Sequence, residues 1–311
     1  MTQITSAPEG FHKNDSQRYS RLPEQRFVMT VDVDGWSSLL RFYGVDHDPI
    51  EADIQVSEED GASRLLDLFE KHRISATFFV PGDIARMHPN MVRLIHQRGH
   101  EVACHGLLHL KNEFLLERGE QESRIKQATG IIERIIGVRP VGFRAPCLRA
   151  NRDTLKILAE NGYLYDSSFI PTFIPGYYGN MNLNFKPYWV SFNSAHDKSH
   201  KTLLEMPVSV NPLFPIPLSA AWMRNLGCTW VRFGMKMNFL LGNPVVFYVH
   251  PRDVLSLPRV EGVPWHLYRN VGLSTIEILD EIITYAKTLG ASFYKAVDLA
   301  LALQSWTGGV S

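Results

Sequence analysis

Short β-rich apolar runs alternate with amphipathic helical stretches along most of this 311-residue chain. The segments "RFVMTVD" (26–32), "ATFFVPG" (76–82) and "HEVAC" (100–104) predict strands. A helix that starts after Ser57 separates the first two, and a helix near 90–98 separates the next two. Such alternation is typical of parallel strands joined by right-handed helical crossovers. We therefore expect an α/β sheet that closes into a barrel, or nearly so.

The same pattern continues to the end of the chain without an internal repeat or an obvious linker, which favours one domain over residues 26–311. Residues 1–25 are polar and predict a loose tail. The stretch 171–199 is less regular and predicts loops over the mouth of the barrel. Further elements are expected as helices at 117–136, 151–158 and 275–288 and as strands at 141–146, 163–168, 203–210 and 244–250.

Composition excludes several classes of protein. Hydrophobic residues make up 45% and charged residues 21%, which is enough apolar material for a large core. The formal net charge is zero and no basic run occurs, so nucleic acid is a poor candidate partner. Three widely spaced cysteines predict no disulfide framework. With no apolar leader and no 18-residue apolar span, we expect a cytoplasmic protein.

Polar residues follow five of the predicted strands. They are Asp32 with Asp34, His105 with His109, Arg144, Asp166 and His250. In a parallel α/β barrel the loops that leave the carboxyl ends of the strands build the active site. We therefore expect all of these side chains at one face of the barrel.

These residue types predict metal-assisted hydrolysis of an amide. Two histidines and one carboxylate are typical ligands of a catalytic zinc, which keeps one position for water. His105 and His109 fit that formula together with Asp34 or Asp32. The other carboxylate is then free as a general base, because two acids separated by one residue on a strand share a face.

The remaining three residues have roles around that centre. His250 can supply a proton to the leaving nitrogen, because histidine titrates near neutral pH. Arg144 can orient the base by a charge-assisted hydrogen bond. Asp166 can hold the acid histidine or pair with Arg144.

These residues together resemble the motifs of the polysaccharide deacetylase family, also called the NodB homology domain or carbohydrate esterase family 4. The likeness covers most of residues 26–170 and resumes near His250. It is carried by "TVDVDG", "ATFFVPG", "GHEVACHGLLH", "GFRAP", "YDSS" and "YVH" in that order. The resemblance implies a distorted, partly open barrel of seven strands. It also implies a hydrolase that removes an acetyl or similar small acyl group from an N-acylated amino sugar in a polysaccharide, oligosaccharide or lipid-linked sugar.

The resemblance also assigns roles. It implies Asp32 as base and Asp34 as metal ligand, although the family's adjacent acids are here separated by one residue, so the two roles could be exchanged. His105 and His109 match the family's other ligands. The resemblance further implies that Arg144 orients the base, that Cys147, where tyrosine is common, offers its backbone N–H to the oxyanion, that His250 is the acid, and that Asp166 is the counterpart of the family's fourth motif.

Three other functions stay open. A hydrolase of a small ureide or cyclic amide would use the same machinery at the carbonyl. Two histidines and a carboxylate also make the facial triad of non-haem iron oxygenases, although those commonly use an all-β scaffold. A binding protein with an inactive site is disfavoured because base, ligands and acid all have candidates. Zinc is the expected metal.

The segment 211–244 mixes apolar residues with Trp222, Arg224, Trp230 and Arg232. This composition is found on helices that lie in a membrane interface. A helix packed on the barrel, with basic side chains that reach out to water, explains it more simply. Peripheral membrane contact through 211–244 is therefore a hypothesis.

Overall fold

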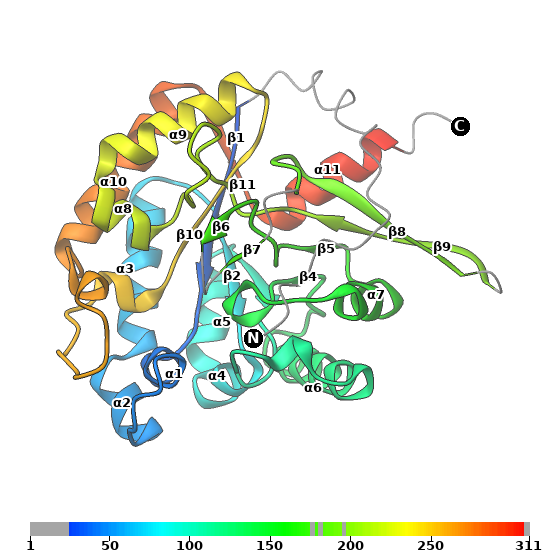
Figure 1. The fold of residues 1–311 in the computed structure, drawn as a ribbon, viewed down its shortest axis with the longest axis horizontal. Coiled ribbons are helices and arrows are strands. Elements are labelled where there is room, and N and C mark those ends of the chain that lie inside the picture. Colours follow the sequence, from blue (N-terminus) through cyan, green and yellow to red (C-terminus); the bar gives the residue numbers. More distant parts are fainter. Residues whose placement is uncertain (1–24, 175–177, 180–182, 195–196, 308–311) are drawn as a thin grey trace.

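The computed structural model describes residues 25–174, 178–179, 183–194 and 197–307. All but the last residue of the predicted polar tail, 1–25, lies outside these ranges. Within them, β1 near the start of the chain pairs with β10 and β11 near its end. The described chain therefore forms one fold around a shared sheet (Figure 1).

Seven parallel strands form the barrel, in the order β10-β1-β2-β3-β4-β5-β9. Two more extend it: β8 pairs with β9 in the antiparallel sense, and β11 runs parallel to the first half of β1. The partly open seven-stranded barrel is thus confirmed. The strands are β1 (Gln25–Asp32), β2 (Thr77–Val80), β3 (Glu101–Cys104), β4 (Gly142–Phe143), β5 (Tyr165–Asp166), β8 (Tyr188–Ser194), β9 (Asp197–Glu205), β10 (Val245–Val249) and β11 (Ala291–Tyr294), with β6 (Phe173–Ile174) and β7 (Tyr178–Gly179) as a separate hairpin.

The gap between β9 and β10 is bridged by irregular chain. After β9 ends at Glu205, the Ser209 N–H donates to the Val246 carbonyl at 3.0 Å. Ser219 then forms an isolated bridge with Tyr248. The strand expected over 203–210 therefore stops halfway, and the barrel closes through single contacts instead of a full ladder.

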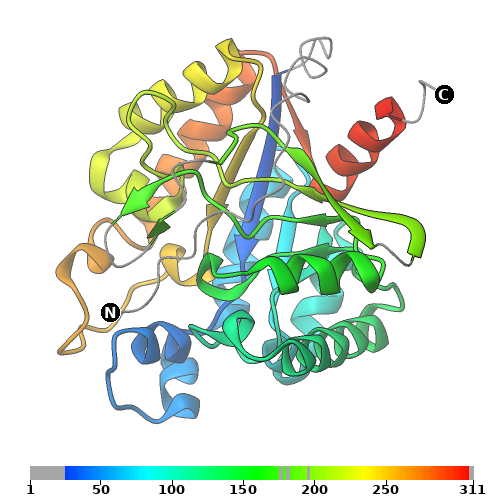
Figure 2. The ribbon, with the colours of Figure 1, turned by 45° about the vertical axis from the view of Figure 1, so that its right-hand side comes forward.

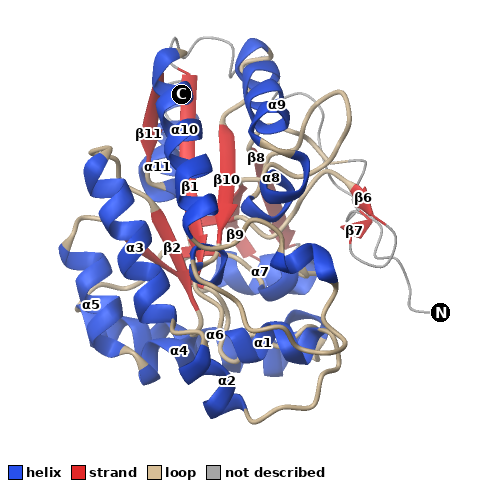
Figure 3. Cartoon of the chain, turned by 90° about the vertical axis from the view of Figure 1, so that its left-hand side faces the viewer, coloured by secondary structure: helices blue, strands red, loops and turns tan. Residues whose placement is uncertain are grey.

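Helices surround the sheet on its outer face (Figure 3). Two helices have side-chain caps at their N-termini: Ser57 Oγ accepts from the Asp60 N–H at 3.3 Å, and Asn151 forms a capping box with Thr154. The helices are α1 (Trp36–Phe42), α2 (Pro49–Gln55), α3 (Glu58–Lys71), α4 (Gly82–Met87), α5 (Pro89–Gln97), α6 (Arg118–Ile136), α7 (Arg152–Glu160), α8 (Ala220–Leu226), α9 (Cys228–Leu240), α10 (Leu273–Thr288) and α11 (Ala296–Thr307).

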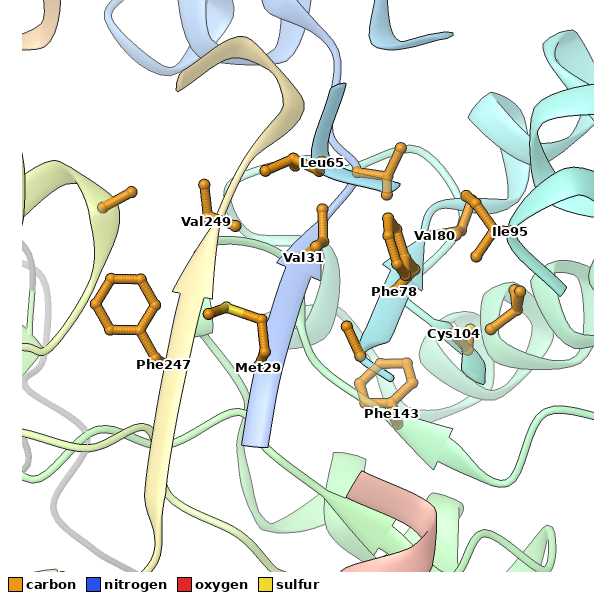
Figure 4. Close-up of a cluster of buried hydrophobic side chains, with 14 of the residues drawn as sticks. Met29, Val31, Leu65, Phe78, Val80, Ile95, Cys104, Phe143, Phe247 and Val249 are labelled. Carbon is orange, nitrogen blue, oxygen red and sulfur yellow. The ribbon is translucent and has the colours of Figure 1, made fainter. Parts of the chain in front are cut away.

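Alternation along the strands separates the outer core from the site. In β1, Phe27, Met29 and Val31 point outward and join the large cluster beneath the helices, part of which Figure 4 shows. The alternate residues Thr30 and Asp32 therefore point into the barrel. One end of the barrel is filled by a second cluster. In this cluster α11 packs on the inward residues Val28, Phe79, Ala103, Tyr165, Leu204, Met206 and Val246. The polar inward residues are left at the opposite end.

The prediction of loops over the mouth at 171–199 is wrong for residues 188–194, which form β8 and extend the sheet beyond β9 by antiparallel backbone pairing. Within this stretch, 175–177, 180–182 and 195–196 lie outside the described residues. The segment 211–244 contains α8 and α9, and α9 packs its residues Val231, Met235 and Phe239 into the outer core. Leu213, Phe214 and Leu240 remain 58%, 59% and 70% exposed, and membrane contact through this segment stays a prediction.

None of the helices in the described ranges combines the length and apolar character that a bilayer crossing requires.

Candidate metal and catalytic site

The expected polar residues gather at the carboxyl end of the barrel. One cavity there is lined by Asp32, Asp34, His105, His109 and His250, which come from the ends of β1, β3 and β10. α1 follows β1 directly and lies at this end of the barrel, whereas α11 lies at the other (Figure 2). The cavity encloses about 800 Å³ including its open mouth. This is the place where a barrel of this type builds an active site.

Arg144 lies fully buried beneath the cavity and holds Asp32. Its Nη1 donates to Asp32 Oδ1 at 2.7 Å and to Thr30 Oγ1 at 2.9 Å. Its Nε and Nη2 donate to the carbonyl and hydroxyl of Ser167 at 3.1 and 2.9 Å. The guanidinium plane is therefore fixed on several sides, and the predicted pairing of Arg144 with Asp32 is present.

Asp34 is buried and lies among cations. Its Oδ1 is 2.5 Å from Arg252 Nη1 and 3.8 Å from His250 Nε2, and its Oδ2 is 3.6 Å from His109 Nε2. Burial alone would raise the pKa of Asp34, but the Arg252 guanidinium, helped by the two histidines, holds that pKa well below its usual range. The Asp34 carboxylate is therefore ionised, as a metal ligand must be.

His105 and His109 are in the form that binds metals. Burial lowers the pKa of His105 and lowers that of His109 to about 3, so both rings are neutral. His105 Nδ1 lies 2.7 Å from the Arg144 carbonyl, which can only accept, so this nitrogen carries the proton. Its Nε2 is then a lone-pair donor of fixed orientation, which is a common arrangement around metal-binding histidines.

The donor set fits a divalent metal, although within the described ranges no three candidate ligands already stand at coordination distances. Tetrahedral zinc with Zn–N and Zn–O bonds near 2.0–2.1 Å needs neighbouring donors about 3.3 Å apart. Asp34 Oδ2 and His109 Nε2 are 3.6 Å apart, and the two imidazole centroids are 5.0 Å apart. His109 Nδ1 is buried and makes no hydrogen bond, whereas Asp34 Oδ1 is paired with Arg252. A buried polar atom without a partner is one that an ordered water or ion would satisfy.

His250 is oriented by a partner that the sequence analysis missed. Its Nδ1 lies 3.1 Å from Asp253 Oδ2, which also accepts the His250 N–H at 2.9 Å. Asp253 Oδ1 in turn accepts from Arg224 Nη2 at 2.9 Å, and Arg224 is also held by the carbonyls of Leu267 and Arg269. His250 Nε2 is thereby directed towards Asp34 and the cavity. A carboxylate three residues after the histidine was the available signal.

The role expected for Asp166 must be corrected. It is fully buried and does not line the cavity, and in place of His250 or Arg144 it binds Ser168, whose N–H and Oγ donate to it at 3.1 and 2.6 Å. Ser168 Oγ also accepts the Ala145 N–H at 2.8 Å. The strand end on which Asp166 lies faces β9 and Glu205. Through Ser168, Asp166 therefore positions the loop after Arg144.

Cys147 lines the cavity on a strained turn. Its φ and ψ are 56° and 18°, and Leu148 follows with φ 54°, in a region that residues other than glycine seldom occupy. Burial raises the pKa of the Cys147 thiol to about 12, so the thiol stays protonated at neutral pH. A thiolate ligand or nucleophile is therefore disfavoured, and the backbone N–H remains the useful group at this position.

A buried carboxylate, Glu113, holds the loop that contains both histidines. Its two oxygens accept the N–H groups of Leu107 at 2.6 Å, Leu108 at 3.3 and 3.2 Å, and Leu110 at 3.1 Å. His109 lies inside this loop with a positive φ of 49°. Glu113 therefore maintains a backbone conformation that would otherwise be unfavourable.

Replacing Glu113 with glutamine is expected to weaken zinc binding by about 10- to 100-fold, the range seen for residues that orient metal ligands. The amide NH2 would face backbone N–H groups that need an acceptor. Chelator competition would measure the affinity, with the exposed Glu117→Gln as the matched control. Equal affinity in the two variants would contradict this role for Glu113.

Two family models match parts of the chain that contribute residues to the cavity. Residues 46–165 match a family model described as polysaccharide deacetylase, and residues 167–277 match one described as a domain of unknown function, DUF3473. The first segment contains His105, His109 and Arg144, whereas His250 and Asp253 lie in the second. The second segment therefore completes the same barrel and the same cavity.

Curated relatives share part of the chain. A peptidoglycan deacetylase of Helicobacter pylori is 28% identical over 169 residues, which is 54% of this chain and 54% of that protein. A peptidoglycan-N-acetylglucosamine deacetylase of Bacillus cereus is 27% identical over 119 residues, which is 37% of this chain and 43% of that protein. The chain thus spans about half, or less, of the length of these relatives.

Solved structures share the fold over nearly the whole chain. A protein of Mycobacterium smegmatis described as a putative polysaccharide deacetylase has a TM-score of 0.65 at 24% identity, covering 92% of this chain and 93% of that one. An allantoinase has a TM-score of 0.63 at 18% identity, covering 97% and 99%. At these identities the likeness establishes the partly open α/β barrel and does not distinguish the reactions of the two neighbours.

Proposed function

Residues 46–165 place the chain in the polysaccharide deacetylase family, and on that premise we propose that it is a metal-dependent hydrolase of N-acylated amino sugars. The bond broken is the amide of a small acyl group, acetyl in the first instance. One observation carries the proposal: the Asp32–Arg144 pair and the His250–Asp253 pair border one cavity that also contains Asp34, His105 and His109.

Asp34, His105 and His109 would hold the metal, with zinc favoured by two neutral imidazoles and one carboxylate. When bound, such a metal polarises the amide carbonyl and lowers the pKa of water. Arg252 pairs with Asp34 in this structure and also lines the cavity. Because Arg252 contacts Asp34 Oδ1, Asp34 Oδ2 remains available to the metal.

The chain's own groups then move the protons. Asp32, oriented by Arg144, accepts a proton from the attacking water. The Cys147 N–H donates to the carbonyl oxygen as negative charge develops there. His250, held through Nδ1 by Asp253, donates a proton from Nε2 to the departing amine nitrogen. The products are a free amino sugar and the carboxylate of the acyl group.

Acetate release tests this proposal most simply. Zinc-loaded protein is expected to release acetate from N-acetylglucosamine oligomers, and removal of the metal with a chelator is expected to abolish release reversibly. Zinc is expected to restore it. Folded, zinc-loaded protein that leaves every amino sugar intact but opens a ureide such as allantoin would contradict the proposal and favour the other reaction of this barrel.

A further inference from the structure

The mouth of the cavity contains two cations that have no carboxylate partner within the described part of the chain. Lys111 and Arg149 line the cavity together with Asp34 and His109. The Lys111 ammonium is exposed and lies 4.4 Å from the centroid of the Phe42 ring. Arg149 is half-buried and donates from Nη1 to Asn112 at 3.0 Å. Both positive charges therefore face the opening without being neutralised.

Some surface cations elsewhere are paired with carboxylates. Examples are Lys71 with Asp280 at 2.5 Å, Arg98 with Asp67 at 2.8 Å and Lys126 with Glu122 at 2.7 Å. The whole chain has equal numbers of basic and acidic residues. The positive charge at the mouth therefore does not reflect a general basic excess of the chain.

The two cations are mounted on the loops that build the site. Lys111 follows the loop that Glu113 holds, and Arg149 follows the turn at Cys147. α1 and the residue after it also contribute Leu39, Phe42 and Tyr43 to the cavity lining, with the Phe42 ring next to Lys111. An aromatic and apolar wall of this kind suits the face of a sugar ring. The cavity therefore has a reactive end, a wall for the sugar and a cationic rim.

We propose that the amino sugar bound here carries an anionic oxygen group, which Lys111 and Arg149 bind at the rim of the cavity. The inference rests on the proposed function for the amide-bearing part of the substrate. Lysine supplies a point charge and arginine a planar fork, and both bind phosphate or carboxylate oxygens. The group is a phosphate on the anomeric carbon or a carboxylate on the sugar ring, and the two sources are separated by the probes below.

Binding would be measured by titration calorimetry on zinc-loaded full-length Asp32→Asn protein, which prevents turnover. The probes are N-acetylglucosamine, its 1-phosphate and the corresponding N-acetylated uronic acid. An anionic probe is expected to bind about tenfold more tightly than the neutral sugar at low salt, with the advantage shrinking as salt is added. The tighter of the two anionic probes identifies the group. Equal affinity for all three would overturn the proposal.

Substitutions of Lys111 and Arg149 test whether these two residues cause the tighter binding of anionic probes. Adding Lys111→Gln and Arg149→Gln is expected to reduce the affinity for the anionic probe to about that for the neutral sugar. Removing two charges elsewhere, by Lys126→Gln and Arg98→Gln, is the matched control. An anion preference that survives the rim variant but falls in the control would also overturn the proposal.

Failure of this inference and failure of the proposed function give different results. Acetate release from neutral and anionic sugars at equal kcat/KM would support the deacetylase and contradict the anionic substrate. Tight binding of an anionic probe that depends on Lys111 and Arg149, without acetate release from any sugar, would support the rim and contradict the deacetylase.

Discussion

Replacing Asp32 with asparagine is expected to lower kcat for acetate release by about 10²- to 10⁴-fold, the usual contribution of a general base. Asparagine keeps an oxygen that can accept from Arg144 Nη1, so the geometry around the buried guanidinium is largely preserved. It lacks the basic carboxylate that removes the proton from water. Initial rates on zinc-saturated protein would measure the effect.

The control is Asp280→Asn, which removes a surface carboxylate paired with Lys71 and His72. It should leave kcat unchanged. Metal content decides the assignment of the two acids: Asp32→Asn should retain zinc, whereas Asp34→Asn should lose it. Loss of zinc from Asp32→Asn with retention in Asp34→Asn would exchange the two roles. Near-normal kcat in Asp32→Asn would remove it from the mechanism.

Replacing Arg144 with methionine is expected to lower the free energy of unfolding by about 3–5 kcal/mol, the cost of leaving one member of a buried ion pair without its partner. The Arg144 side chain is fully buried and that of Asp32 is only 6% exposed. Ser167 and Thr30 would also lose hydrogen bonds. Urea denaturation monitored by circular dichroism would measure the change.

Arg98→Met is the matched control, because Arg98 pairs with Asp67 at the surface. Breaking such an exposed pair is expected to cost less than about 1 kcal/mol. Equal losses for Arg144→Met and Arg98→Met would contradict a structural role for the buried pair. The double variant Asp32→Asn with Arg144→Met should be more stable than Arg144→Met alone, because no unpaired carboxylate remains in the interior.

The fold could be predicted from the sequence because its signals are local. The strand that ends at Asp32 and the helix capped by Asn151 are encoded within a few neighbouring residues. Residues 188–194 contain the alternating apolar residues Tyr188, Val190 and Phe192, a strand signal that the sequence prediction of loops overlooked, and Val190 and Phe192 pack against the outer core. Short strands such as β4, Gly142–Phe143, are instead defined by their neighbours.

The site residues that could be predicted are those that directly follow the end of a strand. The cavity contains Asp32 at the end of β1, Asp34 just after it, both histidines after β3, and His250. Partners that come from distant parts of the chain were not predictable. Arg224 reaches Asp253 across 29 positions, and in the sequence it resembled a basic residue of a surface helix. Asp166 follows a strand as a catalytic residue would, but its side chain faces the interior, and only the structure shows this.

The central claim is that Asp34, His105 and His109 bind one divalent metal beside Asp32. The most direct measurement is anomalous X-ray scattering at the zinc edge from crystals of the full chain grown with zinc. If Asp34, His105 and His109 bind the metal, one strong anomalous peak is expected within about 2.0–2.2 Å of Asp34 Oδ2, His105 Nε2 and His109 Nε2. A zinc-saturated crystal with no peak at these three side chains would contradict this assignment.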